Sequence, residues 1–319
     1  MAIQIDGDGI PLASLAPAAQ VALKSGRKNL IINGGFEVSQ RGDYSTATTA
    51  SNVTYYLDRF KAVVAGGNTV THKSNQLLPN GKYVKTLLHT MTAAGYTAAQ
   101  QFVEDYALVK GQEVTLSAWV KSNVSTTYIN IYDGVSVYSS TTHTGGGAWE
   151  KLSVTATLST SISQLRAECF TGTGRVSGDY FEISQVQLEL GDTATDFEHR
   201  SYGEELSLCE RYFQKLDYDE GDVFVATGYA KTASETKWVY QYHGGEMRAA
   251  PTISETTVTS GYRYETGGWN ILRNNIPNKD NASKKSVQLG NNANTVTANE
   301  PGRFRLNAAG ARISFDAEL

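Results

Sequence analysis

The sequence predicts an all-β protein: two β-sandwich, jelly-roll-like domains joined by a short helix and preceded by a short N-terminal anchoring segment. The chain has 319 residues, about two domains' worth. Charged residues make up 19% of it, below the roughly 25% usual in soluble proteins. Thr, Ser, Asn and 18 Tyr fill the difference. Short stretches that alternate between apolar and polar residues recur between Gly-, Ser- and Asp-containing turns, as strands of a sandwich do.

Residues 1–27 differ from the rest of the chain. Asp6 to Gly9 reads as a turn, and Ser14 can cap a short helix that stops at Gly26. The apolar stripe of this helix is thin, and so short a helix is marginal alone in water. We therefore expect residues 1–27 to pack on another chain.

Strand patterns begin directly afterwards, with an apolar run over Asn29–Asn33. Glu113–Lys121 alternates, with Val114, Leu116, Ala118 and Val120 on one face and Trp119 on the other. In Tyr128–Tyr132, Ile129 and Ile131 face inward, so the residues between them face outward. Further strands are expected over residues 151–158, 165–170 and 180–190.

A helix is expected over Gly203–Leu216, because Ser201 and Glu204 form a capping box and apolar residues then follow one face. The strand patterns resume after it, while Asn and Gly make residues 267–294 look loop-rich. The domains expected are 1–27 as attachment segment, 28–200 as the first sandwich, 201–216 as connecting helix and 217–319 as the second sandwich. Strands of this second sandwich are expected over residues 222–230, 236–243, 247–252, 303–306 and 312–317.

Charge and hydropathy exclude several classes of protein. The net charge is -4, so no basic excess favours nucleic acid as a partner. The longest apolar runs fall short of the roughly 18 residues of a membrane span, and the N-terminus lacks the pattern of a secretory signal. Cys169 and Cys209 are expected to be small buried residues.

Two blocks of sequence resemble a known family. Asn29–Gly42 (NLIINGGFEVSQRG) with Tyr56–Phe60 (YLDRF) resembles the opening of a carbohydrate-binding-module-like jelly roll found in bacteriophage tail-fibre and receptor-binding proteins. The block Gln187–Phe213 resembles that family's closing strand and helix. Met247–Thr252 and Phe315–Leu319 resemble the C-terminal domain that phage proteins attach to it.

The resemblance implies a virion tail-fibre protein, assembled in the host cytoplasm, that attaches to glycans on the host surface. It implies a homotrimer held to another virion tail protein through residues 1–27. Related jelly rolls often bind a structural calcium. Glu37 matches one acidic ligand, but Ser184 and Gln185 stand where the closing strand would supply an Asp. We therefore expect no metal and no cofactor.

Sugar binding by a sandwich needs flat aromatic faces beside amide and hydroxyl groups. The outward faces of two strands provide this mixture, so the candidate glycan-binding residues are Trp119, Tyr128, Asn130 and Tyr132. The alternative is that another strand, loop or subunit covers them. Weaker aromatic candidates are Tyr138, Trp149, Tyr262, Tyr264 and Trp269, with Tyr262–Glu265 read as a distal loop.

The polar residues of the opening motif are expected to be structural, with Asp58 pairing an arginine and Gln40 bonding backbone; Arg41 and Arg59 complete this group. Catalysis is not expected, because the acidic residues and the five histidines form no recognisable site. The acidic residues Glu104, Asp105, Asp179 and Glu182 are read as turn or solvent-facing positions. The sequence thus favours non-catalytic attachment to glycans. The alternative is a purely structural virion component, such as a fibre adaptor or a capsid or tail decoration.

Overall fold

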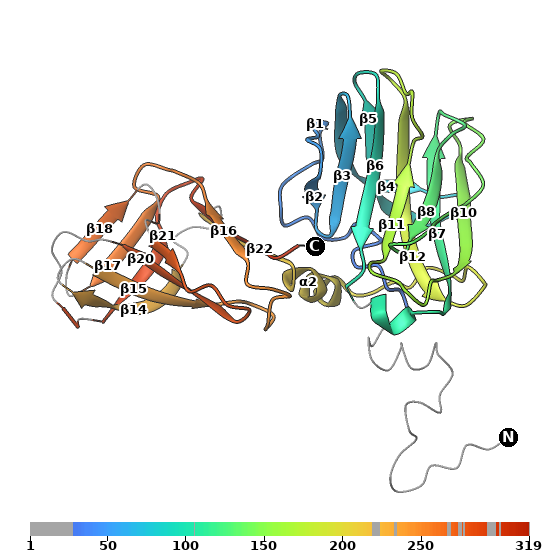
Figure 1. Ribbon diagram of the computed structural model, residues 1–319. Coiled ribbons are helices and arrows are strands. Elements are labelled where there is room, and N and C mark those ends of the chain that lie inside the picture. Colours follow the sequence, from blue (N-terminus) through green and yellow to red (C-terminus); the bar gives the residue numbers. More distant parts are fainter. Residues whose placement is uncertain are drawn as a thin grey trace, which may run out of the picture. The chain divides into compact units, whose positions relative to one another are not determined.

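The computed structural model describes residues 28–318 except residues 105, 219–223, 233–234, 267–268, 274–275, 277, 292–297 and 300. The chain divides into two compact units, the first ending at Glu205 and the second starting at Leu206. Each unit has a hydrophobic core of its own, and each is built almost wholly of strands (Figure 1). The attachment segment expected over 1–27 lies outside the described residues. No helix in the described part of the chain is both long and apolar enough to cross a membrane.

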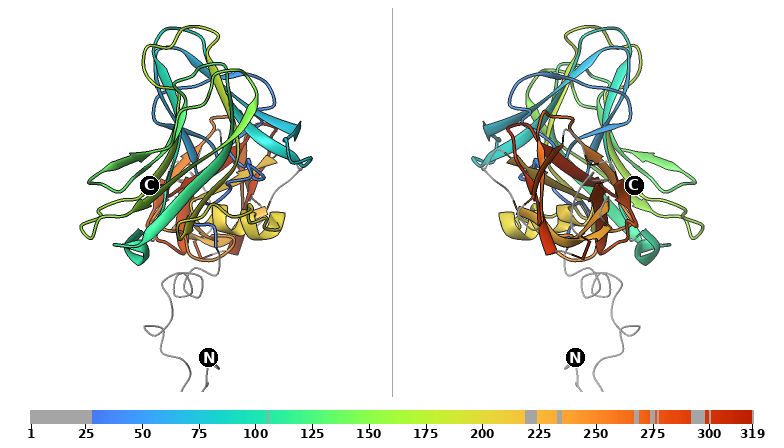
Figure 2. Two further views of the ribbon diagram at one scale, coloured as in Figure 1. Left: turned by 90° about the vertical axis from the view of Figure 1, so that its right-hand side faces the viewer. Right: turned by 90° about the vertical axis from the view of Figure 1, so that its left-hand side faces the viewer.

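Unit 1 is a sandwich of two antiparallel six-stranded sheets, seen as two layers in Figure 2. Sheet A consists, in order, of β1 (Thr48–Thr49), β4 (Asn68–Leu77), β5 (Tyr83–Met91), β12 (Tyr180–Leu190), β7 (Glu113–Ser122) and β10 (Trp149–Thr157). Sheet B consists of β2 (Thr54–Leu57), β3 (Phe60–Ala65), β6 (Tyr96–Phe102), β11 (Arg166–Phe170), β8 (Tyr128–Tyr132) and β9 (Val137–Ser139). A 3-10 helix, η2 (Tyr106–Val109), precedes β7.

The alternation of β7 and β8 places their apolar residues in one core. Val114, Leu116 and Val120 from sheet A and Ile129 and Ile131 from sheet B are all buried there. Two sheets with one apolar face each can bury both only by packing face to face. The predicted all-β sandwich is therefore confirmed. The two cysteines are free and buried, as expected.

The prediction of a strand over Asn29–Asn33 was wrong, because these residues join no sheet. Their polar backbone groups bond largely to side chains instead. The Asn29 Oδ1 accepts from the N–H of Ile31 at 2.9 Å, and the Ile32 N–H donates to the Gln101 Oε1 at 2.8 Å. Asn33 then turns the chain with a φ of 60°. The segment thus buries its apolar side chains without adding a strand.

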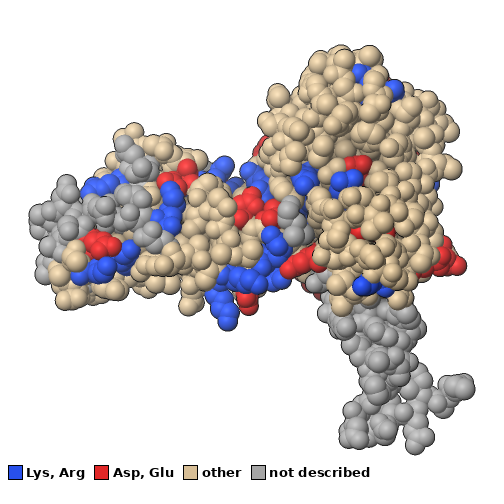
Figure 3. Space-filling model, viewed as in Figure 1, with Lys and Arg blue, Asp and Glu red and all other residues tan. Residues whose placement is uncertain are grey.

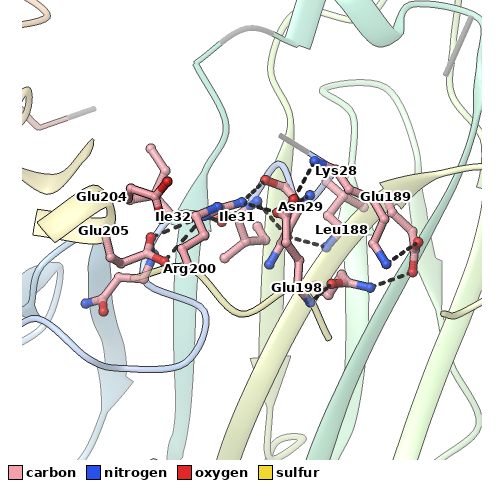
Figure 4. Close-up of polar contacts among 12 residues, drawn as sticks. Lys28, Asn29, Ile31, Ile32, Leu188, Glu189, Glu198, Arg200, Glu204 and Glu205 are labelled. Atoms are coloured by element: carbon pink, nitrogen blue, oxygen red, sulfur yellow. Dashed lines mark hydrogen bonds and ion pairs between the residues drawn. The ribbon is translucent and has the colours of Figure 1, made fainter. Parts of the chain in front are cut away.

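A buried arginine ties this segment to the end of unit 1 (Figure 4). Arg200 donates to the carbonyl oxygens of Asn29 at 2.5 Å and Ile31 at 3.2 Å. It also pairs with the carboxylates of Glu198 at 2.7 Å and Glu205 at 3.2 Å. The two ends of the domain sequence therefore meet in one hydrogen-bonded cluster.

Unit 2 contains a three-stranded and a seven-stranded antiparallel sheet around an aromatic core. The smaller sheet consists, in order, of β13 (Phe213–Asp217), β22 (Arg312–Asp316) and β16 (Thr252–Glu255). The larger consists of β18 (Trp269–Arg273), β17 (Tyr262–Thr266), β21 (Pro301–Leu306), β14 (Phe224–Thr232), β15 (Glu235–Gln241), β20 (Ser286–Asn291) and β19 (Asn278–Asp280).

The helix predicted over Gly203–Leu216 is shorter than expected. Helix α2 spans Tyr202–Glu210, and Ser201 caps it through reciprocal hydrogen bonds with Glu204. Phe213–Asp217 forms a strand instead, since its backbone pairs with β22 and both Phe213 and Leu216 are buried.

Two further expectations for unit 2 need correction. Residues 247–252 were expected to form a strand, but β16 starts only at Thr252. The supposedly loop-rich stretch 267–294 contributes β18, β19 and β20. Sheet pairing forms strands there despite the Asn and Gly content, because a ladder partner matters more than local propensity.

Candidate functional site

The outer face of sheet B carries three of the predicted glycan-binding residues. In β8, Ile129 and Ile131 point into the core, so Tyr128, Asn130 and Tyr132 stand on the opposite face. We call this surface, formed by the outward residues of β3, β6, β11 and β8, the sheet B face.

A row of polar side chains crosses the middle of this face. Cross-strand register sets Asn130 opposite Glu168, and Glu168 opposite Gln100. The Asn130 Nδ2 donates to the Glu168 Oε1 at 2.7 Å, and the Gln100 Nε2 donates to the Glu168 Oε2. Asn130 and Gln100 are only 2% and 6% exposed. The Asn130 Oδ1 has no hydrogen-bond partner, so an acceptor in this row is unused.

Half-buried aromatic rings flank the row on both sides. On one side the Arg166 guanidinium lies 4.9 Å from the ring centre of Tyr132, and the Lys61 ammonium lies 4.2 Å from that of Phe102. On the other side the Phe170 ring meets those of Tyr128 and Tyr96 edge-on, with ring centres 5.6 and 5.5 Å apart.

Charge on the face is small: Lys61 and Arg166 are positive and Glu168 is negative. Glu168 lies 3.9 Å from Arg166. Burial, and then the negative charge of Glu168, raise the pKa of Tyr128, so its hydroxyl stays protonated and able to donate. On the side of unit 1 drawn in Figure 3, uncharged residues cover most of the surface. A face of this kind suits a neutral ligand with flat apolar surfaces and hydroxyl groups.

Trp119, the fourth predicted residue, lies elsewhere. It is on β7 in sheet A, opposite Lys151 and Ser184 and on the outward face. Its expected neighbours Thr115 and Ser117 are buried, and the Thr115 hydroxyl donates to the Gly191 carbonyl at 2.7 Å. The structure therefore does not bring Trp119 together with the residues of β8.

Among the weaker aromatic candidates, Tyr262 and Tyr264 are fully buried in the core of unit 2. The reading of Tyr262–Glu265 as a distal loop was wrong, because these residues belong to β17. Tyr138 packs against the core of unit 1, and Trp149 is half-buried at the start of β10. The side chain of Trp269 lies outside the described residues.

The opening motif buries Asp58 and Arg59 and leaves Gln40 and Arg41 half-buried. Asp58 is fully buried, and its carboxylate accepts from the Gln40 main-chain N–H at 2.6 Å and from the Gln40 side-chain amide at 2.7 Å. The expected bond from Gln40 to the backbone stays a prediction. Arg59, with a φ of 70°, is buried and donates to the Phe102 carbonyl. Arg41 lies 5.1 Å from the ring centre of Tyr55.

The acidic residues are held by structural contacts. Glu182 was read as a turn or solvent-facing residue but is 1% exposed. Its carboxylate accepts from the Thr86 hydroxyl at 2.6 Å and from the Lys73 ammonium at 3.2 Å. Asp179 accepts from the Val176 N–H at 3.0 Å within a turn. Glu104 has a partner, and Asp105 lies outside the described residues.

The calcium ligands implied by the family do not fit here. Glu37 pairs with Lys85 at 2.8 Å, and the Ser184 hydroxyl donates to the Lys85 carbonyl at 2.6 Å. The Arg200 guanidinium lines the same hollow as Glu37 and Gln185. Calcium takes six to eight oxygen ligands, several of them carboxylates. Here the positively charged side chains of Lys85 and Arg200 already lie near Glu37. Within the described ranges, no three His, Cys, Asp or Glu side chains gather as a metal site would require.

Sequence reasoning missed several residues of the sheet B face, among them Gln100, Arg166 and Glu168. Their strands alternate, with Arg166, Glu168 and Phe170 opposite the buried Ala167 and Cys169. The alternation shows that they face outward. Only the register between β6, β11 and β8 shows that they meet Asn130.

Neither a scan against models of known protein families nor a search of curated proteins finds a match. Solved structures do match at low identity. One is the enzymatically active domain of tailspike protein 4 of bacteriophage CBA120, with 16% identity and a TM-score of 0.35, over 51% of this chain and 21% of that one. Another is the C-terminal family 22 carbohydrate-binding module of Clostridium thermocellum Xyn10B, with 13% identity and a TM-score of 0.32, over 48% and 96%. A third is a family 4 carbohydrate-binding module, with 15% identity and a TM-score of 0.31, over 50% and 98%. This chain thus spans about a fifth of the matched tailspike chain.

Proposed function

We propose that this chain is a non-catalytic protein that binds glycans through the sheet B face. The observation that carries the proposal is the buried polar row of Gln100, Glu168 and Asn130 between two aromatic flanks. The rings of Tyr132 and Tyr128 offer flat surfaces to the apolar face of a sugar ring. The row ties the three strands together across the middle of the face, so the face is already ordered before a ligand arrives.

Binding without bond cleavage suits the chemistry of this face. Glycoside hydrolysis commonly uses two carboxylates that flank the scissile bond. On the strands of the sheet B face, Glu168 is the single carboxylate among the outward residues. Its two oxygens accept hydrogen bonds from the side-chain amides of Asn130 and Gln100.

The biological setting that we propose is host-surface attachment by a bacteriophage tail fibre. The support is the resemblance of residues 29–42 and 56–60 to the opening motif of phage receptor-binding proteins. The protein would act as a homotrimer, held to another virion protein through residues 1–27. Many weak contacts to surface glycans would add up, so no single site needs to be tight.

The test is binding of the purified chain to a glycan array, with Tyr132→Ala and Asn130→Ala as site variants. Trp119→Ala is the matched control, because Trp119 is a half-buried aromatic residue on the other sheet of the same unit. We expect saturable binding that the two site variants abolish and the control keeps. Loss in Trp119→Ala alone would move the site to sheet A. No binding by any folded protein would favour the second candidate, a purely structural virion component such as a fibre adaptor or decoration.

A further inference from the structure

A separate hollow of about 200 Å³ lies in unit 1, between β5, β12 and the segment that leads into α2. Its lining includes Tyr83, Gln185, Phe197 and Tyr202. None of its lining residues belongs to the sheet B face, because β5 and β12 are strands of sheet A. The hollow is therefore separate from the proposed glycan-binding face.

Gln185 at the wall of the hollow is strained and unpaired. The register of β12 shifts between Ser184 and Gln187, and Gln185 has a φ of 51°, in the left-handed region that favours glycine. Its side chain is 6% exposed, yet its Nε2 has no hydrogen-bond partner. The Nε of Arg200, another lining residue, also lacks one. Strained residues with unused polar groups gather at ligand sites, where a bound molecule supplies the missing partner.

The other lining residues define what would fit. Val84 and Phe197 are apolar and line the same hollow as Gln185 and Arg200. An acyl group matches both, since its methyl needs apolar contacts and its carbonyl needs a donor. Tyr83 and Tyr202 are 71% and 57% exposed, so their rings are open for stacking on a sugar ring.

The charges of the hollow favour a neutral ligand. The carboxylates of Glu37 and Glu205 line it, and Arg200 is already paired with Glu198 and Glu205. An anion would meet these carboxylates without a free cation to compensate.

We propose that this hollow binds the acetamido group of a neutral N-acetylated sugar, as a second site that is independent of the sheet B face. The acetamido methyl packs on Phe197 and Val84, and its carbonyl accepts from Gln185. The Gln185 amide lies beneath the wall and reaches the carbonyl by turning about its terminal torsion. That torsion is soft, and the turn breaks no hydrogen bond of the Nε2.

The probes are N,N′-diacetylchitobiose and cellobiose, which share ring type and linkage and differ in the acetamido groups. Each is titrated into the full chain while chemical shifts are followed by NMR. We expect diacetylchitobiose to bind at least about tenfold more tightly than cellobiose. Equal affinity for the two sugars, or no titration by either, would overturn the proposal.

Two variants locate the site. Gln185→Met keeps the side-chain length and removes the donor, and we expect it to weaken diacetylchitobiose binding about tenfold. Tyr83→Ala removes an exposed ring that the fold does not need, so its effect on binding can be measured even if Gln185→Met folds poorly. Tyr132→Ala, on the sheet B face, should leave this affinity unchanged. Undiminished binding in Tyr83→Ala and Gln185→Met, or its loss in Tyr132→Ala, would place the sugar elsewhere.

Discussion

At the scale of single residues, Arg200 joins the two ends of the unit 1 sequence. It is 8% exposed and holds two main-chain carbonyls and two carboxylates. Removing one partner of a buried ion pair leaves the other charges uncompensated, which costs about 3–5 kcal/mol. We expect Arg200→Met to lower the free energy of unfolding by this amount in urea denaturation.

The matched control for Arg200→Met is Lys85→Met. Lys85 pairs with Glu37 at 2.8 Å, but both side chains are about one-third or more exposed. Exposed pairs of this kind contribute less than about 1 kcal/mol. Equal destabilisation by the two substitutions would show that the buried contacts of Arg200 contribute no more stability than the exposed Lys85–Glu37 pair.

Glu198 gives this cluster a pH dependence. Burial raises the pKa of Glu198, but hydrogen bonds from the main-chain N–H groups of Lys28 and Asn29, together with Arg200, outweigh it and leave the pKa below its ordinary value. A depressed pKa in the folded state stabilises the fold above the ordinary glutamate pKa of about 4.3. That stabilisation disappears as the pH falls through the folded value.

When the pH falls from neutral to below about 4, we therefore expect the free energy of unfolding to decrease more in the wild-type chain than in Glu198→Gln. Urea denaturation at a series of pH values gives the slope of the free energy of unfolding against pH for both proteins. The variant cannot be protonated at this position, so its slope lacks this contribution. Identical slopes would mean that Glu198 has the same pKa in the folded and unfolded chain.

Part of the candidate site could be predicted from the alternation of apolar and polar residues in the sequence. Alternation alone predicted that Tyr128, Asn130 and Tyr132 face outward, and the structure places them so. Alternation could not reveal that Trp119 stands on the other sheet, nor that Glu168 bonds Asn130. Both facts depend on which strands pair, and pairing is decided by the whole fold.

At the scale of elements, the approach of the opening segment to β12 sets a strict steric limit. A Cβ added at Gly34 would lie 2.1 Å from the carbonyl oxygen of Val186, so the backbone of one element must move. We expect Gly34→Ala to destabilise the protein by about 1–3 kcal/mol or more. Thermal and urea unfolding measure the loss.

Gly203→Ala is the natural comparison for Gly34→Ala. Gly203 lies in the first turn of α2, and nothing is within 4 Å of a Cβ built there. Alanine favours a helix by up to about 1 kcal/mol over glycine. The helix variant should therefore be neutral or slightly stabilised, and a loss as large as that of Gly34→Ala would contradict the steric argument.

The elements that sequence predicted best are those with clean alternation or a complete cap. β7 and β8 are such strands, and the Ser201 capping box does start α2. The end of α2 was misplaced because Phe213 and Leu216 suit a helix face and a strand face equally well. The backbone ladder with β22, far away in sequence, decides between the two.

At the scale of the whole molecule, the two separate cores support a modular protein. Each unit buries its own apolar residues, so the proposed glycan-binding face should not need unit 2. We expect residues 28–205, expressed alone, to unfold cooperatively and to keep the binding of the full chain to a single immobilised glycan at low density. Calorimetry on this fragment tests the cooperative unfolding, and binding measurements test the retained affinity.

The same fragment tests the proposed trimer through avidity. A trimer presents three copies of the sheet B face, and once one copy is bound the others encounter nearby glycans at a high effective concentration. Linked weak sites of this kind can gain roughly 10²–10⁴ in apparent affinity without any new contact. On a surface dense in glycan, the full chain should therefore dissociate far more slowly than residues 28–205, while on a sparse surface the two should behave alike.

Tyr132→Ala removes the contact in every copy, so it should abolish binding on both surfaces. With a fragment that sediments as a monomer, equal dissociation of full chain and fragment on the dense surface would contradict the multivalent mechanism.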